Sequence, residues 1–335
     1  MPFSRSLVVL ATAAVLLPIG SGQAAATTTP PDCPPRAGAP APVREALPPS
    51  AAAFMAAYRA WGAAPTVCAY MDLFTPDGTL MDTGLAAPIG HEAIRKQIER
   101  VLTVVPDYRF DPFSATASPD GRVVFVKARN TGTVTVDGRA TKVDYLTTHR
   151  LVLRGDRVER GHRFWDQTEL FRPLDPGLRD LFAGIGGTAT AAEEPASGTA
   201  SRPGDGIRER QRAWNDRDTD ALVATVGERV RLTGPGLTAP LKGRTAARAY
   251  LDRFFGELHG AELAPGHTVR RGPTTYREWS GTAVVGPERR RVTYGIVERL
   301  TRDRSGVTDW DLSFDTLDLV ATEQQISTLR ARLFG

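Results

Sequence analysis

The sequence predicts an α+β protein that contains two copies of one domain in tandem. Three observations support this prediction: helical patterns precede long strands in each half, landmark residues recur in the same order, and a stretch rich in Gly, Ala, Thr, Ser and Pro separates the halves. Helices followed by a run of antiparallel strands differ from the alternating order that builds a parallel sheet. We therefore expect two separate antiparallel sheets, each with its own helices.

The repeat is visible at three landmarks. The motif Arg-Ala-Trp ends at Trp61 and again at Trp214, 153 positions further on, and Gly90 and Gly243 have the same offset of 153. Each glycine precedes a helical pattern. A Trp-Asp pair on the last predicted strand also occurs twice, at 165–166 and 310–311. A tandem duplication explains all three.

The N-terminus predicts a secretory signal peptide over residues 1–26. Arg5 precedes an apolar stretch at 7–19, and three alanines at 24–26 fit the small-residue cleavage rule. The apolar stretch is shorter than the about 20 residues that a membrane-spanning helix needs. We expect a secreted, extracellular protein with no stable membrane insertion.

The rest of the chain divides by composition. Residues 27–49 form a Pro-rich arm and residues 184–205 a linker, so the domains are expected at 50–183 and 206–335. The only two cysteines are Cys33 and Cys68. In an oxidising compartment this pair predicts one disulfide between the arm and the first domain. The alternative is two unrelated thiols.

Local patterns place the elements of the first half. A helix begins at Ser50 and carries Phe54, Tyr58 and Trp61 on one face at helical spacing. A short helix is expected at 67–74, a strand at 79–82 and a helix at 91–104. Four longer strands, separated by Asp-Gly or Gly-Asp turns, are expected at 108–118, 122–136, 142–154 and 157–171.

Composition excludes several functions. There are 42 Lys and Arg against 38 Asp and Glu, and the short basic runs are interrupted by acids, so we expect no nucleic-acid partner. Five histidines, none at ligand spacing, predict no metal site. The sequence has no phosphate-binding loop and no dinucleotide fingerprint, so no cofactor is expected.

Several segments of the sequence resemble a known family. "YMDLFTPDGTLMD", "APIGHEAIRKQI" and "GHRFWDQTELF" cover much of the first half, and "LKGRTAARAYLDRFF" and "VTDWDLSFD" match more loosely in the second. The chain resembles the SnoaL-like and ketosteroid isomerase-like proteins of the nuclear transport factor 2-like superfamily. The resemblance implies two tandem cone-shaped α+β barrels, each a bent antiparallel sheet wrapped by N-terminal helices around an apolar pocket. This fold serves isomerases, cyclases and non-catalytic binding proteins.

The resemblance implies two alternative catalytic sets. In the isomerase set, Tyr58 donates a hydrogen bond to the enolate, Asp82 moves the proton, and Thr148 stands where a third donor is expected. In the cyclase set, His149 and Asp166 take these roles. Thr148 and His149 are neighbours on one strand and face opposite ways, so both sets cannot hold together. Both carboxylates also have a structural interpretation. Asp82 precedes a turn that it can shape, and the Trp-Asp pair containing Asp166 recurs in both halves, which favours a structural role.

The cone of the first domain is the expected binding site. Its expected lining comprises Trp61, Phe125, Thr148 and Trp165. In the second half Gln211 and Pro235 replace Tyr58 and Asp82 at the repeat offset, so that half is a degenerate copy.

Three hypotheses of function follow from the resemblance and the signal peptide. The first is a secreted tandem protein that binds an apolar small molecule in the cone of the first domain. The second is an isomerase or cyclase, in the first domain only, that transfers a proton next to a carbonyl. The third is a non-catalytic cell-surface scaffold. We also expect the two domains to pair within one chain as a pseudo-dimer.

Overall fold

The computed structural model describes residues 47–185, 207–304 and 306–334. The predicted signal peptide, Cys33 and nearly all of the arm and linker lie outside the described residues, so the disulfide stays a prediction. Within the described residues, no helix is both long and apolar enough to cross a membrane.

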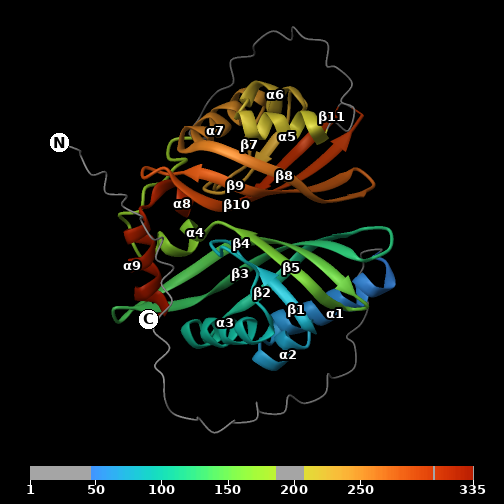
Figure 1. The fold of residues 1–335 in the computed structure, drawn as a ribbon, viewed down its shortest axis with the longest axis vertical. Helices are drawn as coiled ribbons and strands as arrows, with labels where there is room; N and C mark the ends of the chain where they lie inside the picture. The colour runs from blue at the N-terminus through green and yellow to red at the C-terminus, as the bar shows by residue number, and fades with distance from the viewer. Residues whose placement is uncertain (1–46, 186–206, 305, 335) are drawn as a thin grey trace, which may run out of the picture. The chain divides into compact units, whose positions relative to one another are not determined.

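The first domain has the predicted order of helices before strands (Figure 1). Helices α1, α2 and α3 lie on one face of a sheet with the strand order β1-β5-β4-β3-β2, in which only β1 and β5 run parallel. The sheet stays open and does not close into a barrel. The elements are α1 (Pro49–Ala63), α2 (Val67–Met71), β1 (Phe74–Met81), α3 (His91–Val104), β2 (Arg109–Ala117), β3 (Val123–Val136), β4 (Arg139–Arg154), β5 (Arg157–Trp165) and α4 (Gln167–Phe171).

Three boundaries in particular differ from the predicted ones. The second helix ends at Met71, and β1 begins at Phe74 instead of 79. The last strand ends at Trp165 because the carboxylate of Asp166 accepts a hydrogen bond from the Thr168 backbone N–H and caps α4. The predicted Asp-Gly turn between β3 and β4 is confirmed: Asp137 and Gly138 both have positive φ, at 51° and 75°, as a tight hairpin requires.

The second domain repeats this topology. Its sheet has the order β7-β6-β11-β10-β9-β8, and β6 runs parallel to β11 as β1 does to β5. The predicted duplication and the two tandem α+β domains are therefore confirmed, but neither sheet closes into the barrel that the family resemblance implies. The elements are α5 (Ile207–Asp216), α6 (Thr219–Ala224), β6 (Arg231–Thr233), β7 (Leu241–Lys242), α7 (Arg244–Glu257), β8 (Leu258–Arg271), β9 (Thr274–Val285), β10 (Arg290–Asp303), β11 (Gly306–Ser313), α8 (Leu317–Val320) and α9 (Glu323–Phe334).

Each domain has its own apolar core, but α9, the last helix described, belongs to the core of the first domain. Phe54, Tyr58 and Trp61 of α1 are buried against the first sheet, as their spacing predicts. On α9, the stripe Ile326, Leu329 and Leu333 is buried in the same core cluster. The C-terminal helix follows the second domain in sequence and packs in the core of the first.

Candidate functional site

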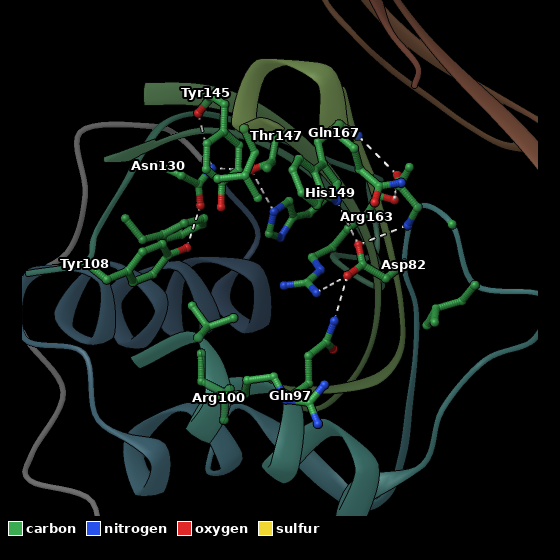
Figure 2. Close-up of a pocket in the computed structure, with 18 of the residues that line it drawn as sticks. Asp82, Gln97, Arg100, Tyr108, Asn130, Tyr145, Thr147, His149, Arg163 and Gln167 are labelled. Atoms are coloured by element: carbon green, nitrogen blue, oxygen red, sulfur yellow. Dashed lines mark hydrogen bonds and ion pairs between the residues drawn. The ribbon is translucent and has the colours of Figure 1, made fainter. Parts of the chain in front are cut away.

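The first domain holds a cavity of about 290 Å³ between its helices and its sheet (Figure 2). Aromatic side chains form much of the wall, whose surface is mainly apolar, and polar side chains make up most of the other lining residues. This composition is typical of small-molecule sites. The aromatic lining includes Tyr58, Trp61, Tyr70, Tyr108, Phe110, Tyr145 and Trp165.

Strand alternation brings the polar groups to the cavity. On β4, Tyr145, Thr147 and His149 are two positions apart and all three line the cavity. On β5, Arg163 and Trp165 do the same.

Five of these side chains form a continuous hydrogen-bonded chain, which we call the polar chain. The Tyr58 hydroxyl lies 2.6 Å from His149 Nδ1, and His149 Nε2 lies 2.8 Å from Thr147 Oγ1. Asn130 Nδ2 donates to the same Thr147 oxygen at 3.1 Å, and the Tyr108 hydroxyl donates to Asn130 Oδ1 at 2.5 Å. The polar chain thus connects α1 to strands β3 and β4 and to Tyr108, the residue before β2, across the cavity wall.

The buried imidazole of His149 is neutral. Burial lowers the pKa of His149 well below its ordinary value, and the charge of Arg163 lowers it further. Burial also raises the pKa of Tyr58 well above 10, so the phenol keeps its proton. With the ring hydrogen on Nε2, Tyr58 donates and Thr147 accepts; with it on Nδ1, the roles reverse. One hydroxyl hydrogen, on Thr147 or on Tyr58, is therefore left to donate elsewhere. This arrangement can relay a proton.

Asp82 lies on the other side of the cavity, and each of its two carboxylate oxygens accepts two hydrogen bonds. Its Oδ1 accepts from the Thr83 backbone N–H and from Trp165 Nε1, each at 3.0 Å. Its Oδ2 accepts from Gln97 Nε2 at 2.8 Å and from the guanidinium of Arg163. These four donors fix the position of the carboxylate. The role of Asp82 as a proton carrier stays a prediction.

The structure brings together five of the residues that the sequence proposed for the site. Tyr58, Trp61, Asp82, His149 and Trp165 all line the cavity. Tyr58 and His149, which came from alternative catalytic sets, are hydrogen-bonded to each other. The two sets therefore contribute to one site.

Asp166 lies outside this cavity. Its Oδ1 accepts from the backbone N–H groups of Thr168 and Thr316, both at 3.0 Å, and from the Thr316 hydroxyl at 2.7 Å. These bonds hold the start of α4 and the segment after β11. The position matches the structural role that repetition of the Trp-Asp pair suggests.

Phe125 and Thr148 were expected in the lining and are placed on the opposite face of the sheet. Phe125 stacks on Tyr276 with ring centroids 5.0 Å apart. The Thr148 hydroxyl lies 2.7 Å from the Ser313 hydroxyl. Both partners belong to the second domain, so this face of the sheet is covered as well as the face toward the cavity.

Sequence reasoning missed Arg163, Asn130, Thr147 and Gln97. For Arg163 and Thr147 a signal existed: each is two positions from a residue already assigned to the cone, Trp165 and His149 respectively. Arg330 of α9 also lines the cavity, and its guanidinium donates to Gln167 Oε1 at 3.1 Å. No local pattern connects that helix with the first domain.

The interior of the second domain is filled. Trp214, Trp279 and Trp310 are fully buried. The carboxylate of Glu298 accepts from Trp279 Nε1 at 2.8 Å, from Trp310 Nε1 at 3.1 Å and from the buried guanidinium of Arg210. Burial raises the pKa of the Glu298 carboxyl, but Arg210 and the indole donors outweigh it, so the pKa is lowered overall.

Within the described ranges, no group of three or more His, Cys, Asp or Glu is arranged to hold a metal ion. The polar lining of the cavity consists of hydrogen-bond donors, acceptors and arginines.

Comparisons with known proteins identify a domain family in both halves of the chain. The family model described as SnoaL-like domain matches residues 52–160 and 207–309. No curated protein matches the chain. Similar solved structures include a putative SnoaL-like polyketide cyclase from Jannaschia, with 17% identity, 39% of this chain and 95% of that chain covered, and a TM-score of 0.33.

Two further solved structures are similar to one part of the chain. The putative polyketide cyclase IdmH from Streptomyces antibioticus has 14% identity, covers 37% of this chain and 97% of its own, and gives a TM-score of 0.33. An NTF2-like protein of unknown function from Burkholderia pseudomallei has 20% identity, covers 35% of this chain and 95% of its own, and gives a TM-score of 0.31.

Proposed function

The chain belongs to the SnoaL-like domain family, and from this premise we propose that its first domain binds an apolar small molecule in the cavity. The observation that carries the proposal is the contrast between the two interiors. The first contains a cavity of about 290 Å³ lined in large part by aromatic rings, whereas three buried tryptophans and an ion pair fill the second. A volume of this size with a mainly apolar surface suits a compound of two or three fused rings.

A cavity-blocking variant tests the proposal. Val101 of α3 lines the cavity, and Val104 on the same helix does not. Val101→Trp fills part of the volume and should weaken binding of a neutral aromatic probe, 2-naphthamide, by at least about 10-fold. The matched control Val104→Trp should retain binding. Calorimetry measures both affinities, and native mass spectrometry of the purified protein detects any ligand retained from expression. Equal affinities in the two variants contradict the proposal.

A second candidate, proton transfer next to a carbonyl, is favoured by one observation. In the polar chain, His149 lies between the hydroxyl groups of Tyr58 and Thr147, which both line the cavity, and its neutral ring can exchange a hydrogen from one nitrogen to the other. Exchange of the α-hydrogens of a bound ketone for deuterium, followed by NMR, tests this function. The Tyr58→Phe variant should lose the exchange. Equal exchange in this variant contradicts it.

We further propose that the protein is secreted and that its two domains pair within the chain. The ion pairs Arg150–Glu278 and Lys127–Asp311, each with side chains at most 13% exposed, support the pairing. Light scattering of the full chain should give the mass of a monomer. Separately expressed halves should associate; two stable halves without affinity for each other contradict the pairing. N-terminal sequencing of protein from the culture medium tests secretion, with a start near residue 27 expected.

A further inference from the structure

Most of the charged side chains that line the cavity are positive. Arg100, Arg163 and Arg330 oppose a single carboxylate, Asp82, and His149 is neutral. Asp82 is already bound by four donors. Among the described residues, neither Arg100 nor Arg330 pairs with a carboxylate, and Arg330 donates to the neutral amide of Gln167. The cavity therefore has an excess of positive charge.

Arg163 is the innermost of these cations. Its guanidinium points from β5 into the cavity (Figure 2), and its side chain is 19% exposed. One Nη group donates to Asp82, and the buried Nε has no partner among the described residues. A guanidinium has five N–H donors, so the bond to Asp82 leaves most of its donor capacity unused. Asp82 fixes its orientation, since Gln97, Trp165 and the Thr83 backbone hold that carboxylate in turn.

The field of Arg163 reaches across the cavity. Burial raises the pKa of Tyr145 to about 12, and the Arg163 charge acts in the opposite direction. The same opposition occurs at Tyr58, Tyr70 and Tyr108. Burial dominates at all four tyrosines and the Asp82 charge adds to it, so Arg163 is the cation that offsets part of the cost of a negative oxygen placed among these rings.

We infer that the cavity takes a flat aromatic compound that carries one anionic oxygen group, a carboxylate or a phenolate, and that this oxygen binds to Arg163. The aromatic rings of the wall contact the body of the compound, and the planar guanidinium matches a two-oxygen anion. Arg330 and the exposed Arg100 add positive charge to the lining. This inference rests on the proposed function and names its class of ligand.

The test uses two probes that share a ring system. 2-Naphthoate carries a carboxylate, and 2-naphthamide is its neutral counterpart. Calorimetry on the full chain should show that naphthoate binds at least about 10-fold more tightly, the range expected for hydrogen bonds to a charged group. Arg163→Met should abolish this preference and leave the affinity for the amide largely unchanged. The control Arg160→Met alters an exposed arginine on the same strand and should keep the preference.

Arg163→Met leaves Asp82 buried without a counter-ion, so a double variant, Asp82→Asn with Arg163→Met, removes both charges and should show the same loss of preference. A salt titration distinguishes Arg163 from exposed arginines such as Arg100. At 0.5 M NaCl, a preference due to Arg163 persists, whereas attraction to exposed arginines is screened. Equal affinities of the two probes for the wild-type protein, or a preference that disappears in salt, overturn the inference and leave the proposed function intact. Failure of both probes to bind overturns the proposed function, and the inference with it.

Discussion

The two domains share one topology and differ in how they use the space between helices and sheet. Trp61 borders an open cavity, and Trp214 at the same repeat position is fully buried in a packed core. Ala57, also on α1, corresponds to Arg210 in the second domain, where a long charged side chain enters the interior. One copy keeps a small side chain and an open volume, whereas the other fills that volume.

Each domain also contains a buried ion pair, with different surroundings. The pair of Arg163 and Asp82 borders the cavity, and Arg163 retains donors that point inward. The pair of Arg210 and Glu298 is closed off, with side chains 4% and 0% exposed. The comparison teaches that a buried arginine–carboxylate pair can do two things. An arginine with unused donors remains available to a ligand, whereas a fully enclosed pair contributes to packing.

The largest expected effect is at the enclosed pair. Arg210→Ala leaves Glu298 buried without its cation and should lower the free energy of unfolding of the second domain by about 3–5 kcal/mol. Urea unfolding followed by tryptophan fluorescence measures the loss, and hydrogen exchange locates it. Arg212→Ala, two positions away with a side chain 72% exposed, should change stability by less than about 0.5 kcal/mol. Similar losses in both variants contradict the proposed packing role.

The predicted disulfide should stabilise only the first domain. Closing a loop of 35 residues between Cys33 and Cys68 contributes roughly 3–4 kcal/mol by the chain-entropy estimate. Intact mass before and after reduction with alkylation decides whether the bond exists. If it does, reduction should speed hydrogen exchange in the first domain and leave the second unchanged. Two free thiols in the unreduced sample contradict the prediction.

Acid should weaken the first domain through His149. Its folded pKa lies well below the value of about 6.5 in the unfolded chain, so below pH 6.5 the unfolded state binds a proton that the folded state does not. Stability therefore falls as pH decreases, by about 1.4 kcal/mol at pH 5.5 for this group. The difference between wild-type protein and a His149→Asn variant, measured at pH 7.5 and 5.5, isolates the effect. A difference independent of pH rules out a buried neutral histidine.

Most of the fold could be predicted because its signals are local. Helical spacing at Phe54, Tyr58 and Trp61, Asp-Gly turns and the repeat offset all lie within short windows or between two similar windows. The end of β5 was not predicted because Asp166 stops the strand through a capping bond that its sequence neighbours do not reveal.

The lining of the cavity was only partly predictable. Residues 124–128 of β3 and 147–149 of β4 are all buried, so alternation of apolar and polar residues cannot distinguish the face toward the cavity from the other face. Phe125 and Thr148 were misplaced for this reason, since Tyr276 and Ser313 that cover them lie far along the chain. Arg163 was missed because a charged residue on a strand is usually solvated.

The position of α9 has a consequence for synthesis. About 155 residues separate Phe171, the end of α4, from Ile326, the first buried residue of the stripe on α9. At roughly 5–20 residues per second, the first domain leaves the ribosome about 8–30 s before the helix that completes its core. During that interval its apolar surface lacks a cover, and the cavity lacks Arg330. A segment made after the second domain therefore finishes the first, and a chain that stops before α9 yields an incomplete site.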